Sequence, residues 1–568
     1  MTYSIFHSTR VLQIFLEVIA VASVMVALMF PRLGREFFRR IEGVFDSLAE
    51  TPRRAILAAA LFPLIVRALL LPVLPIPFPR VHDEFSYLLL GDTLARGRAA
   101  NPTPPYAEHF ETEYELVRPS YASQYQPAQG IALAAGKLAA GNAWFGVWLT
   151  TGLMFGALCW ALAGLMPWRW ALFGSCLAAL QFGIFGFWMN SYFGGSVPAI
   201  GGALALGSLA RRFNPRTAVA CAGGLLILFA SRPVEALIWF AVALAFLFKS
   251  NRRNFDKKAI AAFATVLISG AALLALYNTR VTGDPGKLPY FVYRQSYGTP
   301  QSYWWQPAVV VRSFSNPELK ANYNDQMRYW QRRYSPAAIW DSTWRRLRDF
   351  WRFFAGPFLT PALLLGAFAV RRRKLRPWIW VSLLFIFDHA TYHAWYPQQS
   401  ASETALIFVF VVEGWRVLRL WRRRERLGIA AARNLAAGFA MATMILALGL
   451  AAGPMLPSNW SLAGRVLAGL KSSPGPRDLA VAWLQRIPGK HLVFVQYGTQ
   501  HNWYDEWVFN EADLNSSKIV FARMCTPESD ASLAAAMPDR LVWVADPSRR
   551  FLSRTTISAL INDRLARP

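Results

Sequence analysis

The sequence contains little cysteine. Its four cysteines among 568 residues show no CxxC or CxxxC spacing, so they indicate neither a zinc site nor a disulfide framework. No internal repeat of solenoid length is visible, so a repeat array is not indicated. Three of the cysteines lie in apolar runs and the fourth stands alone near the end of the chain: Cys159, Cys176, Cys221 and Cys525.

Acidic residues are also scarce, with 33 Asp and Glu against 60 Lys and Arg, for a net charge of +27. In a soluble protein this excess would suggest nucleic-acid binding. However, 54% of the residues are hydrophobic and the mean hydropathy is +0.26, which is too apolar for one ordinary soluble core. The basic residues also cluster between apolar runs, so we expect membrane lipid as a partner and no nucleic acid.

About twelve apolar runs are long enough to be transmembrane helices. The first run is too long for a typical signal-peptide core and lacks a small-residue cleavage site, so we interpret it as a retained span. The predicted spans cover residues 11–30, 55–77, 143–164, 169–187, 196–210, 217–231, 234–249, 259–278, 351–370, 377–394, 401–419 and 430–451.

Alternation of these spans places all the basic clusters on one side, which the positive-inside rule identifies as cytoplasmic. The clusters lie at 32–54, 211–216, 249–258, 371–376 and 416–426. The outer side then receives the loops 78–142 and 279–350 and the C-terminal tail. We therefore predict three parts: a first span with a basic cytoplasmic segment (1–54), a transmembrane domain (55–452) and an outer domain (453–568).

The two outer regions differ in their sequence patterns. Loop 279–350 is rich in Tyr, Trp and Arg, as in Tyr303-Trp304-Trp305, which favours amphipathic helices lying flat on the outer face. After a linker at 472–476, short β-branched and aromatic runs at 491–497, 518–524 and 540–545 predict a small α/β domain. The predicted fold is an all-α polytopic membrane protein with this small domain at its C-terminus.

The strongest candidate for chemistry is the stretch from Arg80 to Tyr87, directly after the second span. Asp83 can cap the helix that follows, since its oxygen can accept free amides of the first turn. Capping and catalysis are both compatible with this position. Tyr87 falls one turn beyond Asp83, on the same face of the helix.

Five ordered motifs resemble a bacterial branch of the C superfamily of membrane glycosyltransferases (GT-C). Similar enzymes include the protein O-mannosyltransferases, the aminoarabinose lipid A transferases and the lipopolysaccharide-core sugar transferases of rhizobia. The motifs are Asp83-Glu84 with the following 92–98, then 121–130, 188–195, 231–235 and 506–513.

The resemblance implies transfer of a sugar from a polyprenyl-phosphate donor to an envelope acceptor at the outer face of a bacterial inner membrane, with inversion. Asp83 would be the general base, and Glu84 would position the acceptor or share the role. Arg232 suits the leaving phosphate, although an ion pair with Glu235 also explains it. The predicted substrate-binding residues are Tyr87, His109, Glu111, Tyr125, Asn190, Tyr192, Arg232 and Glu235.

Neither a cofactor nor a metal is expected. Asp388, His389 and His393 place two histidines on one helical face, but a third histidine and the Glu of HExxH are absent, so completion of a helix end is the simpler interpretation. Gln124 and Gln398 stand where the resembling branch tends to have lysine and histidine, so the phosphate or acceptor contacts could differ.

Two other functions remain open: a transporter or flippase of lipid-linked glycans, and a non-catalytic scaffold. Transporters usually hold charged groups inside spans at the bilayer midplane. Here the Asp, Glu and His clusters concentrate in outer loops and at span ends, which favours an enzyme.

Overall fold

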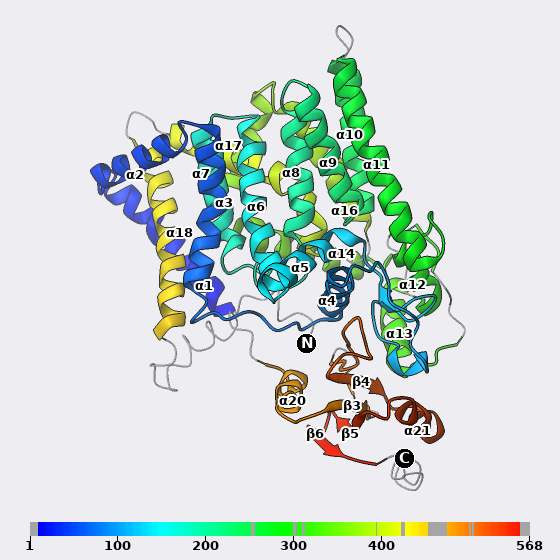
Figure 1. The fold of residues 1–568 in the computed structure, drawn as a ribbon. Coiled ribbons are helices and arrows are strands. Elements are labelled where there is room, and N and C mark those ends of the chain that lie inside the picture. Colours follow the sequence, from blue (N-terminus) through cyan, green and yellow to red (C-terminus); the bar gives the residue numbers. More distant parts are fainter. Residues whose placement is uncertain are drawn as a thin grey trace.

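The computed structural model describes residues 10–250, 256–298, 303, 305–308, 310, 313–392, 395–421, 426–452, 474–498, 501–502 and 505–556. Several predicted features lie outside these ranges: Trp304, His393, the start of the tail at 453–473, and parts of two basic clusters at 251–255 and 422–425. The described part is mostly helical, with a small domain at one end of a helical bundle (Figure 1).

Every predicted apolar run contains helix, which confirms the multi-pass helical fold. Five stretches are long and apolar enough to cross a membrane: Leu12–Met29, Trp144–Ala163, Lys257–Thr282, Pro336–Arg371 and Leu427–Ala451. The number of about twelve spans stays a prediction. The helices are α1 (Arg10–Met29), α3 (Pro52–Leu69), α6 (Trp144–Ala163), α7 (Trp168–Ala178), α8 (Ser196–Leu209), α9 (Pro215–Phe229), α10 (Pro233–Ser250), α11 (Lys257–Thr282), α15 (Gly356–Leu365), α16 (Arg376–Thr391), α17 (Thr404–Leu420) and α18 (Leu427–Ala452).

Three predicted runs are shorter or more broken than their apolarity suggests. Helix α3 ends at Leu69, because prolines at 72, 75, 77 and 79 cannot continue a helix. Helix α7 passes into a π segment, η2 (Ala179–Gly183), and the chain is irregular from 184 to 195. The run 351–370 is divided into η3 (Trp351–Ala355), α15 and η4 (Gly366–Arg371), with Gly356 at a φ of 55° between the first two.

Small residues allow the helices of the bundle to approach closely. A Cβ atom on Gly202 of α8 would lie 1.7 Å from the carbonyl oxygen of Ser402, and one on Gly201 would lie 2.8 Å from that of Gly224. This agrees with the packing role expected for small residues in membrane helices.

The basic segments gather at one end of the bundle, opposite to the C-terminal domain (Figure 1). Helix α2 (Arg35–Leu48) lies at this end, where its Glu42 pairs with Arg419 of α17 and Arg433 of α18, each at 2.8 Å. Nearby, Arg372 and Arg416 both pair with Glu413. The described parts of the basic clusters therefore share one side, as predicted, while the assignment of that side to the cytoplasm remains a prediction.

The other end of the bundle carries the elements of the two outer loops. In the first loop these are α4 (His82–Ala95), η1 (Ala107–Phe110), β1 (Glu115–Leu116), β2 (Ala122–Ser123) and α5 (Pro127–Ala140). The second loop contains α12 (Pro289–Tyr297), α13 (Pro317–Gln331) and α14 (Pro336–Phe350). Trp340 and Trp344 of α14 are 72% and 62% exposed, which agrees with the predicted amphipathic outer-face helices.

The C-terminal domain is a four-stranded sheet with two described helices. The strands β3 (Lys490–Val495), β4 (Ile519–Arg523), β5 (Arg540–Asp546) and β6 (Phe551–Arg554) have the order β4-β3-β5-β6, parallel except for β6. The helices are α20 (Pro476–Leu484) and α21 (Pro527–Ala536). The three predicted strands are confirmed, and β6 was not predicted.

A buried carboxylate on α4 connects this domain to the bundle. Asp92 accepts hydrogen bonds from Lys137 Nζ of α5 at 2.6 Å and from the backbone N–H of Ala512 at 2.8 Å. Arg96, one turn along α4, lies within ion-pair distance of Asp92 and of Asp513. Asp92 therefore binds two elements of the outer loop and one segment of the tail.

We expect Asp92→Asn to loosen the C-terminal domain, because it removes a charge that accepts two short hydrogen bonds in a buried place. A loss of about 2 kcal/mol follows from the usual strength of hydrogen bonds to charged groups. Limited proteolysis of the detergent-solubilised protein should cut the tail domain faster in this variant. Asp513→Asn, which changes a more exposed pair, should have less than half that effect, and equal sensitivity of both variants would contradict the prediction.

Candidate functional site

The candidate site begins where the chain enters α4. Glu84 lies in the first turn and is 1% exposed. Its Oε2 accepts hydrogen bonds from the backbone N–H groups of Arg80 at 2.9 Å and Val81 at 3.3 Å, and its Oε1 accepts one from Tyr192 at 2.9 Å. Val81 is the N-cap residue, so Glu84, and not Asp83 as predicted, supplies the cap. Burial raises the pKa of Glu84 to about 7.

Asp83 has a different environment, although it is the adjacent residue. It is only half-buried, and the hydroxyl of Tyr125 donates a short hydrogen bond to its Oδ1. Burial raises the pKa of Asp83, and the hydrogen bond from Tyr125 partly opposes this effect. Asp83 is thus a partly accessible carboxylate with raised basicity.

Several contacts hold Tyr125 in place. Its ring stacks on that of Tyr87, with 4.1 Å between the centroids. Its backbone N–H donates to Ser123 Oγ at 3.1 Å, and its carbonyl oxygen accepts from the hydroxyl of Tyr277 at 2.9 Å. The predicted residues Asp83, Tyr87 and Tyr125 are therefore brought together, from positions up to 42 residues apart.

His82 and Glu113 form an ion pair beside Asp83, which the sequence did not indicate. Burial acts against a charged imidazole here, but the Glu113 carboxylate outweighs it and raises the pKa of His82. The His82 ring also lies 5.8 Å from that of Phe509 in the C-terminal domain. The tail motif 506–513 is thus part of the surroundings of the site.

Arg232 lies at the outer end of the bundle, just before α10. The start of α5 is bound to this region, since the N–H of Ala128 donates to the carbonyl oxygen of Ala230 at 2.9 Å. The Arg232 charge interacts with the hydroxyls of Tyr87 and Tyr125 and with Glu235. Among the described residues, however, no ion pair within 4.0 Å joins Arg232 to Glu235 or to another carboxylate, so the predicted alternative of a local ion pair is not present.

Gln126, the residue between Tyr125 and α5, is buried at 6% exposure. In the described part of the chain neither polar atom of its side chain has a hydrogen-bond partner. Buried amides are almost always satisfied, so an orphaned one beside a group of titratable residues indicates space for a ligand or water. Gln124 and Gln398, noted above as departures, each leave a buried oxygen without a partner among the same residues.

Asn190 and Tyr192 are used in fixing the loop between η2 and α8. Asn190 accepts a hydrogen bond from Nε of the buried Arg67 at 2.9 Å and donates to the carbonyl oxygens of Ile184 and Gly186. The hydroxyl of Tyr192 donates to the carbonyl oxygen of Pro77 at 3.1 Å. Both side chains bind protein groups: Asn190 binds α3 and its own loop, and Tyr192 binds the segment between α3 and α4.

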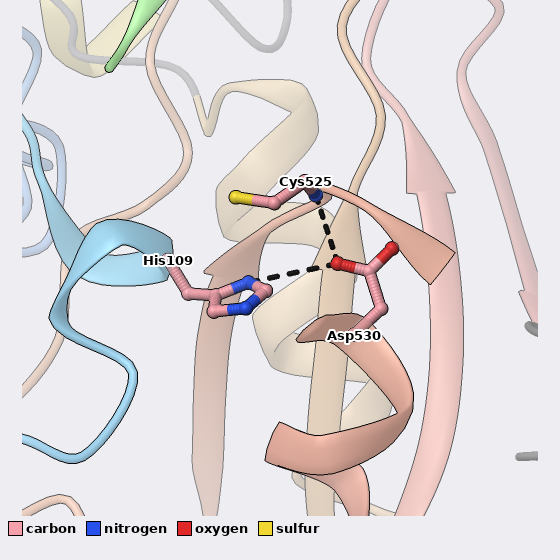
Figure 2. Close-up of side chains that lie close together, drawn as sticks. All are labelled: His109, Cys525 and Asp530. Atoms are coloured by element: carbon pink, nitrogen blue, oxygen red, sulfur yellow. Dashed lines mark hydrogen bonds and ion pairs between the residues drawn. The ribbon is translucent and has the colours of Figure 1, made fainter. Parts of the chain in front are cut away.

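His109 lies in the contact between the first outer loop and the C-terminal domain (Figure 2). Its Nδ1 is 2.7 Å from the carbonyl oxygen of Arg523 and its Nε2 is 2.8 Å from Ser529 Oγ. His109, Cys525 and Asp530 have ligand atoms within 4.8 Å of one another. However, a carbonyl can only accept, so Nδ1 carries the proton, and burial raises the pKa of Cys525 to about 12. These three residues fit a packing role better than a metal site.

Glu111 lines a separate outer cavity of about 160 Å³, between the first outer loop, the end of α12 and the start of α13. Its carboxylate accepts hydrogen bonds from Ser315 Oγ and, at 3.5 Å, from the Tyr297 hydroxyl. Burial raises the pKa of Glu111. Glu113 lies two positions further along the chain, which spans at most about 7 Å.

A second cluster of polar side chains lies at the outer ends of α16 and α17. His389 Nε2 lies 2.8 Å from Glu403 Oε2, its Nδ1 lies 3.4 Å from Asp388 Oδ2, and the hydroxyl of Tyr303 donates to Asp388 Oδ1 at 2.8 Å. Glu235 interacts electrostatically with His389 and Glu403. The sequence indicated Asp388 and His389 but not their partners, because these lie far apart along the chain.

No protein-family model and no curated protein sequence matches the chain. Among solved structures, the chain is similar to the aminoarabinose transferase ArnT from Cupriavidus metallidurans, with 11% identity over 85% of this chain and 92% of that one, at a TM-score of 0.46. ArnT bound to undecaprenyl phosphate gives 14% identity, coverages of 86% and 89%, and a TM-score of 0.44.

The oligosaccharyltransferase AglB from Archaeoglobus fulgidus, in complex with an inhibitory peptide and a dolichol-phosphate, is also similar. Its identity is 13%, the coverages are 86% of this chain and 69% of that one, and the TM-score is 0.43. All three TM-scores are below 0.5. The function proposed below therefore depends on the side chains of this chain.

We expect Glu84→Ala and Asp83→Asn to differ in their effect on stability. Glu84→Ala removes the acceptor of three backbone N–H groups, of which that of Tyr192 is buried, and this should cost roughly 3 kcal/mol. Asp83→Asn keeps the shape of a side chain whose charged form is already disfavoured by burial, so the loss should stay below about 1 kcal/mol. The unfolding temperatures of the two variants in detergent test this, and a larger decrease for Asp83→Asn would contradict it.

Proposed function

We propose that the protein is an inverting glycosyltransferase of the GT-C type. It transfers a sugar from a polyprenyl-phosphate donor to an envelope acceptor at the outer face of a bacterial inner membrane. The proposal rests on two charged groups near Tyr125. Asp83 is half-buried and accepts a hydrogen bond from the Tyr125 hydroxyl, and Arg232 has no carboxylate within ion-pair distance in the described part of the chain.

Asp83 is the general base in this mechanism. The acceptor oxygen forms a bond to the anomeric carbon as the bond from that carbon to the phosphate oxygen breaks, and the hydroxyl proton passes to Asp83. The raised pKa of Asp83 makes its carboxylate a stronger base. The negative charge also stabilises the oxocarbenium character of the sugar. Because attack and departure occur on opposite faces, the anomeric centre is inverted.

Arg232 binds the departing phosphate. A guanidinium matches phosphate oxygens in geometry and charge, and the developing negative charge needs such a group. The neighbouring hydroxyl of Tyr87 and the unsatisfied amide of Gln126 supply further donors. Glu235 partly compensates the positive charge of Arg232 and orients its side chain by electrostatic attraction.

Four other predicted residues act as positioning residues. Glu84 and Tyr192 hold the entrance of α4, Asn190 holds the loop before α8, and His109 binds the C-terminal domain to the outer loop. Glu111 contacts the acceptor, because its cavity opens between outer elements and is lined by polar groups and by the Tyr297 ring.

We expect Asp83→Asn to reduce sugar transfer by at least ~10²-fold, the range for loss of a general base. A strain lacking the protein should lose one pentose or hexose mass from an envelope glycolipid or glycoprotein, and the wild-type chain should restore it. Asp83→Asn should fail to restore it at equal protein level, whereas Asp539→Asn, on the surface of the C-terminal domain, should succeed.

Full restoration by Asp83→Asn would remove Asp83 as the base. An unchanged envelope in the deletion strain, under conditions in which the protein is expressed, would overturn the transferase proposal and favour transport or a scaffold.

We expect Arg232→Ala to weaken binding of undecaprenyl phosphate by about tenfold or more, because a charge-assisted hydrogen bond contributes about 1.5–3 kcal/mol. Native mass spectrometry or a fluorescence titration of the purified protein measures the affinity. Arg98→Ala removes an outer-face arginine that pairs with Asp513, and it should leave the affinity unchanged. Equal affinities for wild type and Arg232→Ala would remove Arg232 from the donor site.

A further inference from the structure

Helix α2 has an apolar face that nothing in the described part of the chain covers. Phe37, Ile41, Val44 and Leu48 are 60%, 39%, 58% and 37% exposed. Their spacing of four, three and four residues places them on one side of the helix. No residue of α2 is buried. A face of this kind in water would be costly, so it needs a partner.

A different face of α2 contacts the bundle. Glu42 pairs with Arg419 and Arg433, and the ring of Phe45 lies 6.2 Å from that of Phe173. Residues 38, 42 and 45 follow the same helical spacing, about a quarter turn from the exposed stripe. The bundle thus fixes the rotation of α2, and this rotation directs the stripe away from the bundle helices.

The segments on either side of α2 in the chain also expose apolar side chains. Before it, Met29, Phe30 and Leu33 are 68%, 56% and 58% exposed. After it, Leu57 and Leu61 of α3 are 58% and 47% exposed. Since α1 contains a candidate membrane span, lipid covers these exposed apolar side chains most simply. Four side chains are also far too few for a stable protein interface, which takes about 20–30 residues a side.

The charges of segment 32–54 indicate which region of the bilayer α2 binds. Segment 32–54 holds six arginines and four carboxylates. Four of these arginines have no carboxylate within ion-pair distance in the described ranges: Arg32, Arg35, Arg40 and Arg53. An amphipathic helix with arginines beside an apolar stripe lies at the boundary of headgroups and acyl chains and favours anionic lipid.

We propose that α2 binds the lipid leaflet at the basic end of the bundle. Phe37, Ile41, Val44 and Leu48 enter the acyl-chain boundary, and the unpaired arginines contact phosphates of anionic lipids. The binding lies at the end opposite to Asp83 and does not depend on the proposed glycosyl transfer.

Fluorescence quenching in the full-length chain tests the proposal. A background without the four native cysteines receives Val44→Cys, or Ser47→Cys as the matched control on the exposed polar face of the same helix. Each is labelled with an environment-sensitive dye and reconstituted into phosphatidylglycerol–phosphatidylcholine vesicles that carry a nitroxide near the headgroup. Equal unfolding temperatures of the labelled proteins show that both fold.

We expect the dye at 44 to emit at shorter wavelength and to be quenched at least ~3-fold more than the dye at 47, with weaker quenching when phosphatidylglycerol is omitted. Water-like emission and equal quenching at both positions would overturn lipid binding. Efficient crosslinking between copies through Val44→Cys, with no quenching by the lipid nitroxide, would also overturn it, because a second chain would then cover the stripe.

Discussion

The cost of placing charge in hydrocarbon determines the arrangement of this protein. Along the helices of the bundle, close contact of small residues such as Gly201 and Gly202 replaces polar interactions. The charged groups are left for the two ends. The basic clusters occupy one end, and most of the carboxylates, histidines and tyrosines described above occupy the other, together with Arg67 and Arg232. The candidate site therefore assembles from the ends of several helices and the loops between them, and no single helix contains it.

The sequence predicts what depends on local pattern. Apolar length located the helices, and β-branched runs located β3, β4 and β5. The motif at 80–87 pointed to Asp83, and the structure brings Tyr87 and Tyr125 beside it. Prolines after Leu69 end α3 early. These prolines are visible in the sequence, but the predicted span 55–77 followed the apolar run and not the prolines.

Contacts between distant segments were not predictable in the same way. The His82–Glu113 pair, the partners of His389 and the orphaned amide of Gln126 depend on how loops fold against each other. The predicted pairing of Arg232 with Glu235 rested on sequence spacing alone. Residues three apart at a helix start can point in different directions, because the residue before the helix does not follow the helical path.

Asp83 and Glu84 show how one peptide bond separates two kinds of carboxylate. Glu84 is only 1% exposed, and its two oxygens accept hydrogen bonds from three backbone N–H groups, so it is bound within the protein and is not open to a ligand. Asp83 points the other way, and its Oδ1 receives only one neutral donor, the Tyr125 hydroxyl. A neutral donor orients the carboxylate without the strong pKa decrease that an arginine would cause.

The C-terminal domain limits the direction from which Asp83 can be reached. Phe509 stacks on Phe85 with 4.1 Å between the ring centroids, and Glu506 pairs with Arg523, which also pairs with Glu318 of α13. These contacts cover α4 two residues beyond Asp83, while Asp83 itself stays half-exposed. In the transfer proposed above, an acceptor approaches between the domain and the outer helices, and a lipid-linked donor approaches from the bundle side, where Arg232 lies. The proposal thereby places the two substrates on opposite sides of the reacting carbon, as a single inverting displacement requires.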